Sequence, residues 1–186
     1  ANELLNLKLS QDELIEHALA GEKIASGARH ADNLAPSLKG GLQCVYSIDP
    51  VKTYTMKIPE VFLLILHPHY KLETAKARAI LDPKIDLHDW IEQSRKLASF
   101  TLACQNGDLD LFRQSLQDLV IEPQRSHLIP GFADLRKMAL AGGAWGFTIS
   151  GAGPSCFAVC QSKSQAETIA VELQKCLFEK HRLACD

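Results

Sequence analysis

One stretch of the sequence brings acid, imidazole and amide side chains together among small residues. Glu22, His30 and Asn33 fall within residues 21–41, where Gly, Ala, Ser, Asp, Asn and Pro predominate and no steady helical or strand period is kept. Side chains of these three types can bind a metal ion or hydrogen-bond to a polar ligand. An ordinary loop with Asx hydrogen bonds has the same composition. The local pattern therefore leaves a binding loop and a structural turn equally open.

Two segments far from this stretch each supply an arginine. Thr74 and Arg78 are four residues apart in an expected helix and so share one of its faces, and Arg125 lies in the segment EPQRSHLIPG at residues 122–131. A single arginine is usually a solvated surface residue, but a planar guanidinium is also the side chain best suited to hold a carboxylate by two hydrogen bonds. Two such groups near residues 21–41 would suit an amino-acid substrate.

A glycine-rich connection formed by Gly151, Ala152 and Gly153 joins two expected strands late in the chain. Glycine permits positive φ and a close approach of the backbone to a ligand. A plain β-hairpin explains the same residues. This connection therefore indicates a binding site only when it is taken together with the other segments.

The elements that must position these residues follow a simple order. Residues 1–7 have the composition of a helix end, and Ser10 with Glu13 forms a capping box for a second helix that ends near Gly21. The other expected elements are strands at 42–48, 54–58 and 61–66, helices at 74–81, 86–106 and 108–120, a helix after Pro130, strands at 145–150 and 155–160, and a last helix capped by Ser164. The helix at 86–106 has an apolar face made of Trp90, Ile91, Ser94, Leu97, Ala98, Thr101 and Leu102. This order predicts an α+β fold, with helices on one face of a mostly antiparallel sheet.

Composition limits the classes of function. Apolar residues make up 46% and charged residues 23% of the 186 residues, as in folded soluble proteins. The formal net charge is -2 and no run of Lys and Arg occurs, so nucleic acid is not expected as a partner. The longest apolar run, residues 61–66, is too short to span a membrane and no secretory leader opens the chain, which predicts a cytoplasmic protein. The six cysteines form no CxxC pair and are expected to be buried free thiols.

Four of these segments together resemble the homoserine kinases of the GHMP kinase superfamily. The resemblance rests on HADNLAP at residues 30–36 after a glutamate, TAKAR at 74–78, EPQRSHLIPG at 122–131 and SGAGPS at 150–155, in this order and spacing. It covers most of the chain, and the combination of HxDN with EPxR is specific. It implies that ATP, with Mg²⁺, phosphorylates the hydroxyl of L-homoserine in threonine biosynthesis. A homodimer is the default assembly to consider, because it is the commonest soluble oligomer.

The resemblance also implies roles for individual residues. Glu22 would bind the magnesium ion that bridges the ATP phosphates, as a hard oxygen ligand for a hard cation. His30 and Asn33 would face the substrate hydroxyl and the phosphoryl group in transit. Because an amide cannot act as a general base, the reaction would depend on positioning and charge stabilisation. The homoserine carboxylate would be bound by Arg78 and Arg125, with Thr74 lining the same site. Support for the phosphate loop, and so for ATP, would come from Gly151, Ala152 and Gly153.

One motif of the superfamily is missing from the sequence, namely the Pro-x-x-x-Gly-Leu-Gly-Ser-Ser phosphate loop. Residues 1–55 would therefore be a remnant of the amino-terminal ATP-binding domain and residues 56–186 a ferredoxin-like carboxy-terminal domain, and this chain alone should be inactive. Two alternatives stay open. Another GHMP kinase, acting on mevalonate or a sugar, is disfavoured by the paired Arg78 and Arg125, because such substrates do not all carry an α-carboxylate. A non-catalytic regulatory or dimerisation domain would keep the fold without the activity.

Overall fold

The chain is divided into two compact units, Ala1–Ile58 and Pro59–Asp186. The structure, a computed structural model, describes residues 2–26 and 30–186. The division falls three residues after the expected boundary at residue 55. That the first unit is a remnant of an ATP-binding domain stays a prediction.

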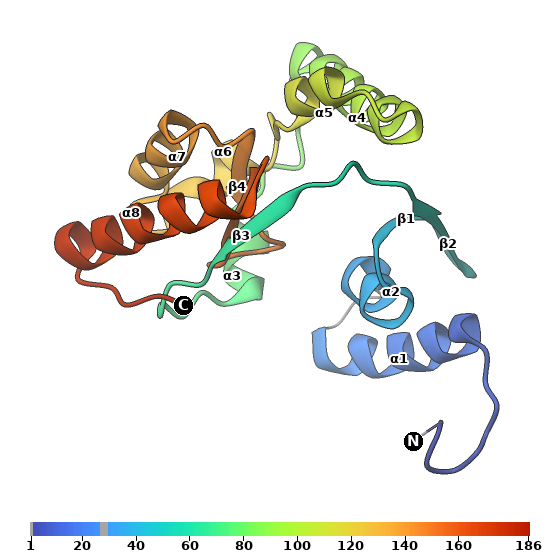
Figure 1. The fold of residues 1–186 in the computed structure, drawn as a ribbon. Coiled ribbons are helices and arrows are strands. Elements are labelled where there is room, and N and C mark those ends of the chain that lie inside the picture. The colour runs from blue at the N-terminus through green and yellow to red at the C-terminus, as the bar shows by residue number, and fades with distance from the viewer. Residues whose placement is uncertain (1, 27–29) are drawn as a thin grey trace. The chain divides into compact units, whose positions relative to one another are not determined.

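The described residues of the first unit form two helices and a β-hairpin (Figure 1). Helix α1 (Gln11–Ser26) packs against α2 (Ala31–Lys39), and the small core between them contains four fully buried residues: Ile15, Leu19, Ala31 and Ala35. Strands β1 (Leu42–Ile48) and β2 (Val51–Met56) pair antiparallel from Leu42 opposite Met56 to Ile48 opposite Val51. The expected Asp49-Pro50 turn is confirmed by this pairing. Helix α1 begins at the expected capping box, in which the Ser10 amide donates to Glu13 Oε2 at 2.8 Å.

Residues 21–41 were expected to be a loop, and that prediction was wrong for most of the stretch. Helix α1 continues past Gly21 to Ser26, and α2 occupies residues 31–39. The misreading arose because Ala and Ser tolerate a helix nearly as well as a loop, and a single Gly inside a helix costs only about 1 kcal/mol relative to Ala. Residues 2–6 form turns rather than the end of a helix, while residue 1 lies outside the described residues.

The second unit is built on a three-stranded antiparallel sheet. Strands β3 (Phe62–Leu66), β4 (Gly146–Ile149) and β5 (Cys156–Cys160) lie in the order β3-β5-β4. Leu64 and Phe147 both stand opposite Ala158, so their side chains share one face of the sheet. Helices α7 (Phe132–Ala141) and α8 (Lys163–His181) pack on that face. The α+β class, with helices against an antiparallel sheet, is therefore confirmed.

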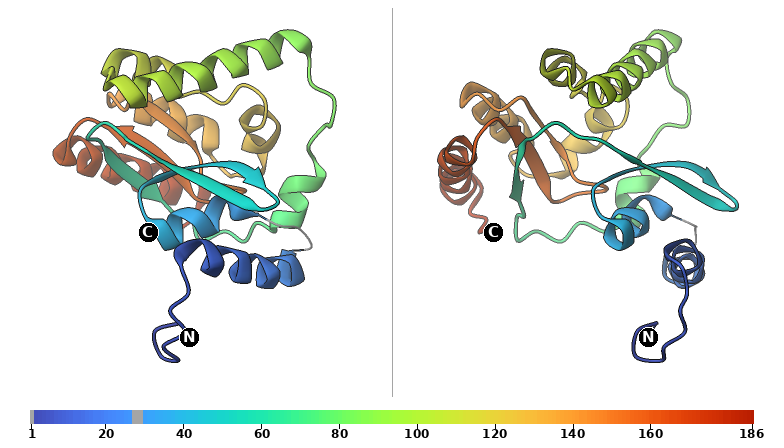
Figure 2. Two further views of the ribbon diagram at one scale, coloured as in Figure 1. Left: turned by 90° about the vertical axis from the view of Figure 1, so that its right-hand side faces the viewer. Right: turned by 45° about the vertical axis from the view of Figure 1, so that its right-hand side comes forward.

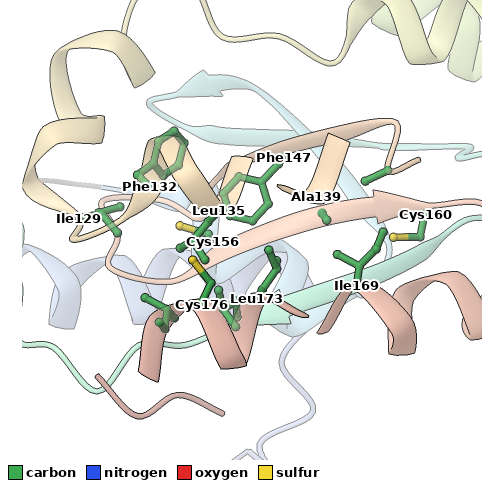
Figure 3. Close-up of a cluster of buried hydrophobic side chains, with 14 residues drawn as sticks. Ile129, Phe132, Leu135, Ala139, Phe147, Cys156, Cys160, Ile169, Leu173 and Cys176 are labelled. Atoms are coloured by element: carbon green, nitrogen blue, oxygen red, sulfur yellow. The ribbon is translucent and has the colours of Figure 1, made fainter. Parts of the chain in front are cut away.

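The main core lies between this face of the sheet and the two helices (Figure 3). Leu135 of α7 and Leu173 of α8 have no exposed surface, and Phe132 packs on Phe147 with ring centroids 5.5 Å apart. All six cysteines are free, as expected, but only four of them are buried, because Cys44 is exposed and Cys185 is half-buried. Burial raises the pKa of the Cys156 thiol to about 12, with Glu122 adding a smaller effect, so this thiol stays neutral.

Five further helices complete the second unit: α3 (Thr74–Ala79), α4 (Leu87–Asn106), α5 (Leu109–Ser115), α6 (Glu122–Arg125) and the 3-10 helix η1 (Ser126–Leu128). Asp86 and Asp108 cap α4 and α5 as expected, since their carboxylates accept hydrogen bonds from the amides of His88 and Leu111. Two details differ from expectation. Helix α5 ends at Ser115 rather than near residue 120, and the N-cap of α8 is Ser162, not Ser164.

Helix α4 packs side by side with α5 (Figure 2), but not through the face expected from its sequence. Trp90 is 56% exposed and Leu97 64% exposed, whereas Ala103 and Cys104, next to that face, are buried. A helical period identifies an apolar face but not the element that covers it. The uncharged side of α4 is therefore a solvent-exposed surface of this chain.

Candidate active site

The first-unit candidates lie at one end of α2 and in α1. His30 is the N-cap residue of α2, with extended backbone (φ -115°, ψ 104°), and Asn33 lies one turn further along with an exposed side chain. The Nε2 atom of His30 is buried and has no hydrogen-bond partner among the described residues. Buried polar atoms in proteins nearly always have a partner. Binding of a polar ligand by His30 and Asn33 stays a prediction.

Glu22 is half-buried in the last turns of α1, the helix that packs against α2. Magnesium in nucleotide sites is commonly held by one or two carboxylates together with substrate phosphates and water. Glu22 is a carboxylate of this kind, and its binding of magnesium stays a prediction. A group of exposed residues elsewhere, Asp86, His88 and Asp89, also offers ligand atoms, but Asp86 is already used as the cap of α4.

Arg125 connects three of the segments singled out in the sequence. Its Nε donates to the carbonyl oxygen of Ala77 at 2.8 Å, and its Nη1 donates to the carbonyl oxygen of Gly151 at 3.3 Å. Ala77 precedes Arg78 in α3, and Gly151 begins the turn of the β4–β5 connection. Segments separated by 48 and 26 residues in sequence therefore meet at one guanidinium.

Helix α3 carries Thr74 and Arg78 one turn apart, as expected, and both side chains are exposed. The hydrogen bond from Arg125 to the carbonyl of Ala77 brings Arg125 to the backbone of this helix. The convergence of Arg78 and Arg125 on one carboxylate, with His30 close by, stays a prediction.

The glycine-rich connection forms the tight turn expected of it. Gly151 and Gly153 have positive φ values of 60° and 80°, which favour glycine. A Cβ at Gly153 would also lie 3.0 Å from Cδ1 of Ile129, whereas nothing lies within 4 Å of one at Gly151. Packing as well as φ therefore disfavours a side chain at Gly153, whereas the space beside Gly151 is open. A role in binding ATP stays a prediction for Gly151, Ala152 and Gly153.

Glu122 is a notable residue that the sequence did not reveal. It is only 3% exposed and accepts a hydrogen bond from Arg136 Nη1 at 2.6 Å. Burial raises the pKa of the Glu122 carboxyl, although Thr148, Arg136 and the backbone of Ile149 partly offset the shift. Sequence reasoning used this glutamate only as part of the EPxR motif, and its partners lie too far along the chain to be found from spacing.

A hollow of about 450 Å³ lies beside η1 and the start of α7. Its lining comes from Ser126, His127, Ile129, Pro130, Gly131, Phe132, Ala133 and Asp134. None of the expected site residues contributes to that lining.

Comparison with known proteins identifies the class of this fold. The family described as GHMP kinases C terminal matches residues 100–179. The homoserine kinase of Cytophaga hutchinsonii has a crystal structure that matches the whole chain with a TM-score of 0.94 and 38% identity, over 59% of its own length. Residues 100–179 are therefore similar to the carboxy-terminal part of GHMP kinases, and the whole chain has the fold of the corresponding part of a homoserine kinase.

The more specific similarity is to homoserine kinases. The chain is 42% identical to the homoserine kinase of Xanthomonas campestris pv. campestris over 94% of this chain and 53% of that protein. It is 37% identical to the homoserine kinase of Chloroherpeton thalassium over 100% of this chain and 59% of that protein. The chain thus spans somewhat more than half the length of these relatives. No described helix is long and apolar enough to cross a membrane.

Proposed function

We propose that this chain is the carboxy-terminal portion of a homoserine kinase, which transfers the γ-phosphoryl group of ATP to the hydroxyl of L-homoserine in the cytoplasm, as a step of threonine biosynthesis. The observation that carries the proposal is the meeting of α3, α6 and the glycine-rich turn at Arg125. These are the segments that carry the proposed carboxylate-binding and nucleotide-supporting residues. Identity of about 40% to homoserine kinases over nearly the whole chain supports the same substrate.

The proposed reaction forms one oxygen–phosphorus bond and breaks another. The homoserine oxygen bonds to the γ-phosphorus, the bond to ADP breaks, and the hydroxyl proton passes to the phosphoryl group or to water. Asn33 cannot take that proton, because an amide is not a base at neutral pH. Instead His30 and Asn33 would orient the hydroxyl and the phosphoryl group, and catalysis would come from positioning and charge stabilisation.

Substrate choice in this proposal depends on the two arginines. Arg78 and Arg125 would bind the α-carboxylate, and Thr74 would line the same site. Magnesium, held by Glu22, would neutralise charge on the ATP phosphates. Gly151, Ala152 and Gly153 would support the phosphate-binding segment supplied by the rest of the enzyme.

The proposal is tested with the full-length protein that contains this chain. Production of ADP is measured with ATP, Mg²⁺ and one acceptor at a time: L-homoserine, mevalonate or galactose. We expect phosphorylation of L-homoserine only, and its loss in Arg78→Ala. Activity with mevalonate or galactose alone would identify a different GHMP kinase, and no activity with any acceptor would favour a non-catalytic domain. The 186-residue chain assayed alone should be inactive.

A homodimer is a further part of the proposal, because two-fold dimers are the commonest soluble oligomers. The exposed apolar side of α4, which includes Trp90 and Leu97, offers surface for such a contact. Sedimentation of Leu97→Glu should show a smaller species than the unaltered protein, and an unchanged mass would place any dimer contact elsewhere.

A further inference from the structure

Helix α6 is too short to hold Arg125 in place by itself. It has four residues, and a single turn of helix is unstable in water without tertiary contacts. Its orientation must therefore be set by side chains that reach other elements. Gln124 provides one such contact, since its Oε1 accepts a hydrogen bond from the amide of Asp82 at 2.7 Å.

Glu122 provides the buried contact, at the opposite end of α6 from Arg125. Its Oε1 accepts a hydrogen bond from Arg136 Nη1 of α7 at 2.6 Å. Its Oε2 is buried without a hydrogen-bond partner in the part of the chain that the structure describes, and the carboxyl group lies near Thr148 and Ile149 of β4. The Glu122 side chain is 3% exposed and that of Arg136 is 38% exposed. Water therefore reaches the cation but hardly the carboxylate, and loss of this partner would leave a buried charge without compensation.

Glu122 and Arg125 both reach the end of the same strand. Glu122 contacts the last residues of β4, and Arg125 donates to Gly151, two positions beyond that strand. The short helix is thereby fixed to the sheet at both of its ends. A small shift of α6 would displace the Arg125 guanidinium from the two carbonyl groups that orient it, even in a protein that still folds.

We propose that Glu122 is a positioning residue, which fixes α6 against α7 and β4 and so holds the Arg125 guanidinium in the orientation that binds the substrate carboxylate. This inference rests on the proposed function for its kinetic consequence. It does not rest on that function for its structural consequence, because the hydrogen bond from Arg125 to Ala77 exists without substrate.

A merely structural role for Glu122 would have a different signature. Loss of folded protein lowers the measured maximal rate, because fewer molecules are active, but it leaves the KM of the folded molecules unchanged. Loss of positioning raises the KM for homoserine and leaves the KM for ATP nearly unchanged. The two roles are thus separated by which constant moves.

The test compares Glu122→Gln with a matched control in the full-length protein. Asp134→Asn removes an exposed ion pair with Lys180 from α7, the helix that also carries Arg136. We expect Glu122→Gln to raise the KM for homoserine about tenfold and to change the KM for ATP less than about twofold. Asp134→Asn should alter neither constant. Unchanged KM values in folded Glu122→Gln would overturn the proposal.

A second readout does not depend on activity. In the unaltered protein the Nε proton of Arg125 should exchange slowly with solvent, because it is bonded to the Ala77 carbonyl. NMR of ¹⁵N-labelled arginine side chains should show this proton exchanging at least about tenfold faster in Glu122→Gln. If the full-length protein does not phosphorylate homoserine, the proposed function fails, while this exchange rate still decides the role of Glu122. Equal exchange in both proteins would refute the positioning role.

If Glu122→Gln does not fold, a second variant that removes the charges of both Glu122 and Arg136 takes its place. Glu122→Gln with Arg136→Met leaves no buried ion without a partner, so it should fold even if the single variant does not. The single variant removes the charge but keeps an acceptor oxygen at residue 122, whereas the double variant also removes the Arg136 donor, so the bond that fixes α6 is gone. We expect at least the same rise in the KM for homoserine and the same faster exchange at Arg125. A folded double variant with normal values of both would overturn the proposal.

Discussion

Replacement of Arg125 by lysine separates the two tasks that this residue would perform. The change keeps the positive charge but replaces a planar group with a single ammonium. The structure gives Arg125 two hydrogen bonds to backbone carbonyls, at 2.8 Å to Ala77 and 3.3 Å to Gly151. A lysine at this position would keep at most one of the two hydrogen bonds, because a single ammonium group cannot reproduce both of their directions.

The expected magnitude follows from these contacts. A hydrogen bond made by a charged group contributes about 1.5–3 kcal/mol, and the lower value applies here because Arg125 is only half-buried and one bond is long. We therefore expect a loss of about 1–2 kcal/mol in the free energy of unfolding, or roughly 3–6 °C in Tm for a chain of this size. If Arg125 also binds the carboxylate at two points, the KM for homoserine should rise about 10- to 100-fold, with a smaller change for ATP.

Two assays and one control variant separate the structural role of Arg125 from its proposed role in substrate binding. Thermal unfolding measures the first effect, and steady-state kinetics of the full-length protein, with each substrate varied in turn, measures the second. Arg95→Lys, at an exposed ion pair on α4, controls for the loss of a guanidinium as such. A stability loss without any change in the KM for homoserine would show that Arg125 is purely structural. Equal changes in both KM values would contradict its assignment to the carboxylate.

Three other predictions concern the described fold. The pKa of Glu122 is raised, so its carboxyl group holds a proton more tightly in the folded chain than in the unfolded one. The free energy of unfolding, measured by urea unfolding at a series of pH values, should therefore fall as pH rises from the ordinary pKa of 4.5 through the raised one. In Glu122→Gln the free energy of unfolding should change less over the same pH range. Exposed Cys44 should react with a thiol reagent at the rate of a free cysteine, whereas buried Cys156, with its pKa near 12, should react at least about a thousandfold more slowly until the protein is unfolded. Leu173→Ala should cost about 2–5 kcal/mol because the side chain is 0% exposed, and Val171→Ala, on the same helix but 61% exposed, should cost less than about 1 kcal/mol by urea unfolding.

Local signals in the sequence identified most of the elements. The caps at Asp86 and Asp108 and the capping box at Ser10 depend on atoms within three residues of each other, so spacing alone revealed them. The same signal misled at the last helix, where Ser162 lies two positions before the expected cap at Ser164. A capping signal in the sequence thus predicts that a helix begins more reliably than it predicts the residue at which the helix begins.

Long-range partners could not be found in this way. Strand β3 follows β1 and β2 in sequence, but it pairs with β5, so that Leu64 lies opposite Ala158. The exposed side of α4 has the same origin, because an apolar stripe in a sequence does not say what packs on it. The partner of Glu122 was equally invisible, since Arg136 lies 14 residues away on another helix.

The Arg125 guanidinium has both a structural task and a proposed binding task. A guanidinium has five N–H groups. Two of those of Arg125 bind carbonyl groups on two different elements, which fixes the plane of the side chain before any ligand arrives. No described residue accepts a hydrogen bond from its Nη2 atom, and in the proposed function these N–H groups would bind the carboxylate at a reduced cost in conformational entropy. A lysine would have to divide one ammonium between the carbonyls and the ligand. The structural task and the proposed binding task therefore call for the same residue type, and only an experiment that measures stability and substrate affinity together can distinguish them.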